Sequence, residues 1–135
     1  GIPVIYYGDE FGMPGAGDPD NRRMMKFENL SQDEKTLREK TEKFIKLRRK
    51  YMPLMFGDFK FLEVTETEMI YSRSYFGQTI LVIFNKSEKN KLLKINISEI
   101  DKPETLKPIF NSSFKTEKSV LEVNIPGYSY EIFVQ

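Results

Sequence analysis

The first seven residues place the strongest constraint on the fold of this chain. Residues 1–7 form an apolar run with Pro3 near its start, and the run ends abruptly at residues 8–10, Gly-Asp-Glu. Such a run is typical of a parallel strand that is buried on both faces and has polar residues at its carboxyl end. Parallel neighbours require crossover connections of a dozen or more residues, and none precedes residue 1 in this sequence. We therefore expect the chain to begin within a domain.

Composition excludes several functions for the chain alone. The 135 residues carry a net charge of +1, which favours neither nucleic acid nor an anionic membrane as a partner. No cysteine is present, so there is no disulfide framework or thiolate metal site, and the cellular compartment stays open between cytoplasmic and secreted. Histidine is also absent, which removes the commonest general base and metal ligand. No apolar run approaches the length of a membrane span, and we expect a soluble chain.

A long loop and one helix follow the opening run. Residues 8–30 are rich in Gly, Pro, Asp and Asn, and a loop of this length is typically functional or disordered. Ser31 and Glu34 have the spacing of a capping box, and apolar residues recur at helical spacing after them. These signals predict a helix over residues 32–51 that Pro53 ends.

The remainder of the sequence is typical of an antiparallel β-domain. Short apolar or alternating runs are separated by turn-forming residues from residue 53 onward. Residues 80–84 are apolar on both faces and predict a central strand. Seven strands are predicted, and together they indicate a β-sandwich: 59–64, 69–74, 78–85, 91–97, 106–110, 120–124 and 128–134.

The opening segment resembles a known family. The pattern Gly-x-Pro-x-Ile-Tyr-Tyr-Gly-Asp-Glu over residues 1–10 is similar to the eighth barrel strand of the α-amylase family, glycoside hydrolase 13. Residues 17–22, Gly-Asp-Pro-Asp-Asn-Arg, resemble the family's loop after that strand, most of all in the α-amylase, neopullulanase and cyclomaltodextrinase branch. The order of one helix and then a β-domain also matches the family, whose (β/α)₈ barrel precedes a β-sandwich.

The resemblance implies a mainly β chain with two parts. Residues 1–52 would be the last βα unit of a truncated (β/α)₈ barrel, with a strand over 1–7, a loop over 8–30 and a helix over 32–51. Residues 53–135 would be the C-terminal antiparallel β-sandwich. The family's active-site histidines and its earlier strands, which carry the catalytic carboxylates, have no counterpart here. We therefore expect the chain to be a non-catalytic fragment of an α-glucan-acting, retaining glycosidase.

Three residues are candidates for substrate binding. In the family, the Asp and Arg that match Asp18 and Arg22 bind glucose on the non-reducing side of the cleaved bond. A carboxylate accepts hydrogen bonds from sugar hydroxyls and a guanidinium donates to them, so the pair can orient one glucose unit. An alternative is an ion pair that only holds the loop in shape. Tyr7 is a further candidate, for the wall of the cleft.

Two other carboxylates are candidates for a different role. Asp9 and Glu10 could act as an acid and base pair, but adjacent strand residues point to opposite faces, which favours anchoring of the loop. No catalytic residue, metal ligand or cofactor is therefore assigned to this chain. A calcium site in the intact enzyme, using Asp18, Asp20 and Asn21 with barrel residues, stays an alternative.

The partners expected from the sequence are an α-glucan or maltooligosaccharide, bound through the intact enzyme, and the missing amino-terminal part of the barrel. The apolar opening run also predicts self-association, because an unpaired strand edge is a template for another copy. Two further functions stay open for residues 53–135. One is a stand-alone carbohydrate-binding or interaction module, and the other is a structural cover for the barrel. The aromatic residues that motivate the module are Tyr71, Tyr75, Phe76, Tyr128 and Tyr130.

Overall fold

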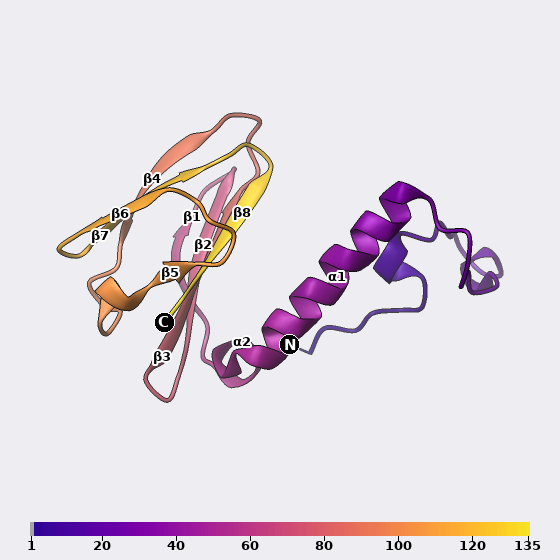
Figure 1. Cartoon of the computed structure of the whole chain (residues 1–135), viewed down its shortest axis with the longest axis horizontal. Helices are drawn as coiled ribbons and strands as arrows, with labels where there is room; N and C mark the ends of the chain where they lie inside the picture. The colour runs from indigo at the N-terminus through magenta and orange to yellow at the C-terminus, as the bar shows by residue number, and fades with distance from the viewer. Residues whose placement is uncertain (1) are drawn as a thin grey trace. The chain divides into compact units, whose positions relative to one another are not determined.

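The computed structural model describes residues 2–135 and divides the chain into two compact units (Figure 1). The first unit ends at Lys50, and the second comprises Tyr51–Gln135. The first contains two short 3₁₀ helices and one long helix, and the second contains a short helix, a further 3₁₀ helix and eight strands.

The long helix of the first unit begins at the predicted capping box. Helix α1 spans Gln32–Lys50. The backbone N–H of Ser31 donates to Glu34 Oε2 at 2.6 Å, and the backbone N–H of Glu34 donates to Ser31 Oγ at 3.2 Å. Two donors that the first helical turn leaves unpaired are thereby satisfied. The ammonium of Lys26, 2.8 Å from Glu34, is the main reason why the pKa of this carboxyl lies below its usual range.

The opening run differs from its prediction. Residues 2–6 form no strand, and no other described segment pairs with them. Ile2 and Val4 are 88% and 86% exposed. The physical reason is that a parallel strand is stabilised by neighbours on both sides, and the described part of the chain supplies none. The apolar pattern of residues 2–6 is typical of a buried strand, but these residues are exposed in the described part of the chain.

The second unit is the antiparallel β-sandwich that the sequence predicts. A five-stranded sheet has the order β1-β2-β3-β8-β5 and a three-stranded sheet the order β4-β7-β6, and Figure 1 shows the two sheets as separate layers. The strands are β1 (Lys60–Val64), β2 (Glu68–Tyr75), β3 (Gln78–Asn85), β4 (Lys91–Asn96), β5 (Lys107–Pro108), β6 (Phe114–Glu117), β7 (Val120–Ile125) and β8 (Ser129–Val134). Each predicted strand overlaps an observed strand, although within 106–110 the strand is limited to Lys107–Pro108. Strand β6 and helix η3 (Pro103–Thr105) were not predicted.

Pro53 has a different role from the one predicted. Helix α1 ends at Lys50, and Pro53 lies in the first turn of a second helix, α2 (Met52–Phe56). Proline is tolerated in a first turn because the N–H that it lacks would have no partner there. Arg73 of β2 donates to the carbonyl oxygens of Leu54 and Gly57, at 2.7 and 2.6 Å, and so ties α2 to the sheet.

The core lies between the two sheets. The five-stranded sheet contributes buried side chains such as Ile70, Leu81 and Phe133, and the three-stranded sheet contributes Leu121 and Val123 among others. Because side chains alternate along a strand, the next residues on β2, β3 and β8 face away from this core. That second face of the five-stranded sheet carries α2 at one end and a groove at the other.

Candidate functional site

The predicted loop is anchored by the two carboxylates at its start. Asp9 Oδ2 accepts a hydrogen bond from the backbone N–H of Tyr6 at 2.9 Å, and Glu10 Oε2 accepts one from Gly8 at 2.8 Å. Helix η1 (Asp9–Phe11) lies between Gly8 and Gly12, which both have positive φ. The side chains of Asp9 and Glu10 therefore bind their own loop and do not converge as a pair.

Asp18 and Arg22 lie together further along the loop. Arg22 Nε is 2.9 Å from Asp18 Oδ1, and the two side chains are 71% and 61% exposed. An ion pair this exposed contributes little to stability, because water screens it. The remaining donors of the guanidinium and the second carboxylate oxygen can both contact a ligand from solvent.

A second ion pair, next to the first, shapes the loop. Arg23 donates to both oxygens of Asp20, at 2.7 and 2.9 Å. Asp20 also accepts from the backbone N–H of Ala16 at 2.9 Å, so its carboxylate links helix η2 (Asp20–Arg22) to the preceding turn. The bidentate Asp20–Arg23 pair is the less exposed of the two, and Asp18 and Arg22 are the more accessible to solvent.

Tyr7 lies beside Tyr6, whose hydroxyl reaches the later part of the loop. The centroids of the two rings are 4.4 Å apart, and Tyr6 Oη donates to the carbonyl oxygen of Asn21 at 3.5 Å. Hydrogen bonding with Tyr7 is the main cause that raises the pKa of Tyr6. Tyr7 is 37% exposed. These contacts join residues 6–7 to the segment that carries Asp18 and Arg22.

The described residues contain no ready metal centre and no membrane helix. Over residues 2–135, no three acidic, histidine or cysteine side chains gather around a common point, so Asp18 and Asp20 have no third such ligand here. No helix in this range is long and apolar enough to cross a bilayer.

The β-sandwich carries a groove that the sequence did not predict. Val64, Met69, Phe84 and Tyr130 are directly paired across β1, β2, β3 and β8 and form its floor. The groove has a volume of about 540 Å³, within the usual range of small-molecule sites. Its rim is formed by the β1–β2 turn on one side and by the residues around Lys86 and Tyr128 on the other.

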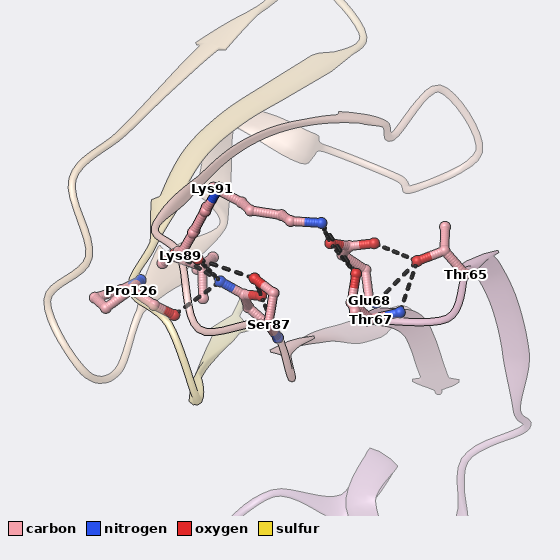
Figure 2. Close-up of polar contacts among 9 residues, drawn as sticks. Thr65, Thr67, Glu68, Ser87, Lys89, Lys91 and Pro126 are labelled. Atoms are coloured by element: carbon pink, nitrogen blue, oxygen red, sulfur yellow. Dashed lines mark hydrogen bonds and ion pairs between the residues drawn. The ribbon is translucent and has the colours of Figure 1, made fainter.

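A buried ion pair supports the β1–β2 turn at the groove. Glu68 is 7% exposed and accepts hydrogen bonds from Lys91 on the opposite sheet and from the Thr65 and Thr67 hydroxyls (Figure 2). The Lys91 ammonium, helped by Thr65, lowers the pKa of Glu68 from 4.5 to about 2. The carboxylate is therefore charged at neutral pH, and the adjacent Lys91 ammonium balances its charge.

Asn85 fixes the neighbouring part of the rim. Its side-chain amide is fully buried and donates to the carbonyl oxygens of Lys89, Ile125 and Pro126 at 2.9, 3.1 and 2.9 Å. Its amide oxygen accepts from the backbone and hydroxyl of Ser87 (Figure 2). Asn85 thereby joins the end of β3 to the β7–β8 turn, from which Tyr128 projects.

The five aromatic residues that motivated the sugar-binding module are divided between the two ends of the sheet. Tyr75 contacts Phe56 and Phe76 at the β2–β3 hairpin, whereas Tyr128 and Tyr130 line the groove. Tyr71 lies between them, stacked on Phe59 with ring centroids 4.6 Å apart. The groove instead includes Phe84, which was predicted only as part of a central strand. The period-two alternation through Val82 and Phe84 was the available signal.

The comparisons with known proteins agree with this architecture. No family model matches the chain. It is 40% identical over 96 residues to a cyclomaltodextrinase of Thermoanaerobacter pseudethanolicus, and this match covers 71% of this chain and 17% of that protein. It is 30% identical over 135 residues to a cyclomaltodextrinase of Geobacillus thermopakistaniensis, which covers 98% of this chain and 23% of that protein. The native debranching enzyme of Nostoc punctiforme superposes with a TM-score of 0.82 at 23% identity, covering 100% of this chain and 28% of that one.

A long polar loop, a helix and an antiparallel β-sandwich, in this order, define the carboxyl-terminal portion of a barrel glycosidase. The chain belongs to the α-amylase family, glycoside hydrolase 13, and corresponds to this portion of its enzymes. It spans about a fifth of the length of the two cyclomaltodextrinases.

Proposed function

We propose that this chain is the carboxyl-terminal part of an α-glucan-acting glycoside hydrolase, in which it supplies a substrate-orienting loop and an accessory β-domain. The observation that carries the proposal is the 30% identity to a cyclomaltodextrinase over 135 residues, a match that includes the loop. Proteins named maltogenic α-amylase and neopullulanase are related over shorter stretches. Their names indicate α-linked glucans as the substrate class.

The loop would orient one glucose unit of the substrate. Asp18 would accept hydrogen bonds from sugar hydroxyls, and Arg22, already held by Asp18, would donate to them. The Asp20–Arg23 pair would keep the loop in shape without touching the sugar. Tyr7 would form part of the cleft wall. Holding a substrate in a reactive geometry lowers the barrier to reaction without any bond being made to these residues.

Catalysis would depend on residues outside this chain. A retaining glycosidase needs two carboxylates about 5 Å apart, one acting as the nucleophile and the other as the acid and base. Asp9 and Glu10 are instead engaged with the loop backbone. The proposed partner for the reaction is the amino-terminal barrel portion of such an enzyme, and the chain alone is expected not to hydrolyse maltodextrin.

A chimeric enzyme tests the proposal. The matching segment of the Geobacillus thermopakistaniensis cyclomaltodextrinase is replaced by residues 1–135, and hydrolysis of a cyclomaltodextrin is measured. We expect an active chimera, in which Asp18→Ala or Arg22→Ala lowers kcat/KM about 10- to 100-fold, since hydrogen bonds to charged groups contribute ~1.5–3 kcal/mol.

The control is Lys26→Ala, which removes a charge from the end of the same loop and lies outside the sugar-binding pair. It should leave kcat/KM within about threefold. A folded chimera in which Asp18→Ala and Lys26→Ala have equal effects would contradict the role of Asp18. Hydrolysis by the isolated chain that is abolished by Asp9→Ala would contradict the proposal that catalysis lies elsewhere.

The β-sandwich as a sugar-binding module is the second candidate function. One observation favours it, the groove on the face of the five-stranded sheet opposite the core, with aromatic rings on its floor and polar groups on its rim.

A further inference from the structure

We propose that the β-sandwich contains a carboxylate-binding nest, formed by the backbone N–H groups of Ile109, Phe110 and Ser112. The side chain of Glu131 occupies this nest and thereby holds the segment that connects β5 to β6. The inference concerns the β-sandwich alone and does not depend on the proposed function.

Glu131 lies on the core side of the five-stranded sheet. It belongs to β8 and is directly paired with Ile83 of β3, and the next residue on the same face of β8 is Phe133. Ile83 and Phe133 belong to the hydrophobic core, and Glu131 is fully buried like them. A carboxylate in such a place is costly unless hydrogen-bond donors or a cation replace the water that it loses. None of the ion pairs of the described residues involves Glu131.

Backbone N–H groups take the place of a cation. Glu131 Oε1 accepts from Ile109 at 3.1 Å and from Phe110 at 2.9 Å, and Glu131 Oε2 accepts from Ser112 at 2.9 Å. The N–H of Ile132, the next residue of β8, also donates to Oε1, at 2.8 Å. The carboxylate accepts in all four contacts, and hydrogen bonds from N–H groups to a carboxylate are stronger than those between neutral groups.

The backbone of the connecting segment is shaped to present these donors together. Asn111 lies between two of the donating residues and has a φ of 65°, in the left-handed region. A left-handed residue within a turn directs neighbouring N–H groups towards one point, and backbone nests bind anions in this way. Asparagine is among the residues that adopt this conformation most readily. The nest is therefore a property of residues 109–112, and Glu131 is the ligand that it holds.

The nest lies where the chain passes from one sheet to the other. Strand β5 belongs to the five-stranded sheet and β6 to the three-stranded sheet, and residues 109–113 connect them. The pairing of β5 with β8 is limited to Lys107 and Pro108, and it is extended by the N–H of Ile109, which also donates to the Ile132 carbonyl at 2.9 Å. Because this pairing is short, we expect the connection to open locally when the Glu131 carboxylate is lost.

Amide hydrogen exchange of the 135-residue chain, resolved by NMR, tests the role of the carboxylate. Glu131→Gln keeps the shape of the side chain but replaces one oxygen by an NH₂ group, which cannot accept. The N–H of Phe110 or Ser112 then loses its acceptor in a buried setting. We expect the protection of at least one of these two amides to fall about tenfold more than that of Leu81 in the central strand β3.

Glu131→Ala with added acetate tests whether the nest binds a carboxylate. The substitution leaves only Cβ, and acetate supplies the missing carbon and the carboxylate. We expect Glu131→Ala to reduce the protection of Ser112 and acetate to restore it in a saturable manner, at constant ionic strength. Acetamide, a neutral molecule of the same shape, should restore none, because its NH₂ group cannot accept from the nest.

Glu68→Gln is the matched control. Glu68 is also a buried carboxylate of the five-stranded sheet, but its partners are Lys91 and two threonine hydroxyls. Its replacement leaves the nest occupied, so it should lower the protection of Ser112 and Leu81 by the same factor.

The inference is overturned if Glu131→Gln lowers the protection of Phe110, Ser112 and Leu81 equally, as the control does. It is also overturned if a folded Glu131→Ala chain keeps full protection at Ser112. The same conclusion follows if acetate restores no protection, or no more than acetamide does. Should Glu131→Ala fail to fold, the comparison of Glu131→Gln with Glu68→Gln decides alone.

Discussion

Acidic residues of this chain differ sharply in what they do. Asp18 is exposed and pairs with one arginine, whereas Asp20, two residues later, is bound by Arg23 and the loop backbone. Glu131 is fully buried and accepts hydrogen bonds from the backbone N–H groups of Ile109, Phe110 and Ser112. The sequence could propose Asp18 from its motif, but nothing local distinguishes Glu131 from a surface residue. Its partners lie about 20 residues away and become visible only in the fold.

Glu68 should control the acid stability of the β-sandwich. Its folded-state pKa of about 2 lies below its ordinary value of 4.5, so the charged form stabilises the native state at neutral pH. This contribution is complete above about pH 4.5 and is lost as the pH falls towards 2. We expect Glu68→Gln to lower the free energy of unfolding by ~1–3 kcal/mol at pH 7 and to flatten its decline between pH 4.5 and 2.

Urea unfolding at a series of pH values measures this effect. Glu122→Gln is the control, because Glu122 pairs with Lys94 at 3.2 Å in a more exposed setting and should cost under about 1 kcal/mol. If both variants lost the same stability at pH 7, the buried ion pair would have no special role.

At the scale of elements, the sequence predicted the helix and strands whose bounds depend on local capping and turn signals and on the alternation of apolar and polar residues. The capping box gave the start of α1, and β3 was predicted with its observed bounds because turn residues flank an apolar run. Strand β6 (Phe114–Glu117) was missed because it is a short, largely exposed edge strand whose pairing with β7 overrides a weak local preference. Residues 1–7 were predicted as a strand from their apolar pattern, but the described residues 2–6 form none, because no other described segment pairs with them.

The site residues also fall into two groups, those that a local motif predicts and those that only the fold brings together. The loop residues Asp18, Arg22 and Tyr7 come from a contiguous motif, and their roles stay predictions. The groove combines residues from four strands, so no single segment of the sequence predicts it. Its position depends on strand order, which alternation alone does not specify.

The capping box at Ser31 should contribute measurably to α1. Ser31→Ala removes the hydroxyl that accepts from Glu34, and we expect ~1 kcal/mol of lost helix stability. The loss should appear as reduced helical ellipticity at 222 nm in thermal melts of the chain. Thr36→Ala is the control, since the Thr36 hydroxyl bonds back to the Gln32 carbonyl within the helix and caps nothing. A larger loss from Thr36→Ala than from Ser31→Ala would contradict the assignment.

At the scale of the whole molecule, the exposed opening run should govern solution behaviour. Ile2 and Val4 are almost fully exposed, and an unpaired extended apolar segment favours association with another copy. We expect the isolated chain to self-associate in the micromolar range and Val4→Lys to shift it towards monomer. Light scattering coupled to size-exclusion chromatography measures the change, with Val120→Lys, a substitution at an exposed position of the β-sandwich, as the control. A wild-type chain that stays monomeric at every concentration would contradict this expectation.

The position of β8 has a consequence for how the β-sandwich is made in the cell. This strand is the last along the chain, yet it lies between β3 and β5 and supplies Phe133 to the core and Tyr130 to the groove. During synthesis, the five-stranded sheet is therefore incomplete until residue 134 has left the ribosome, and β3 has an open edge until then. Loss of even a few residues from β8 would remove an interior strand and leave β5 without its partner.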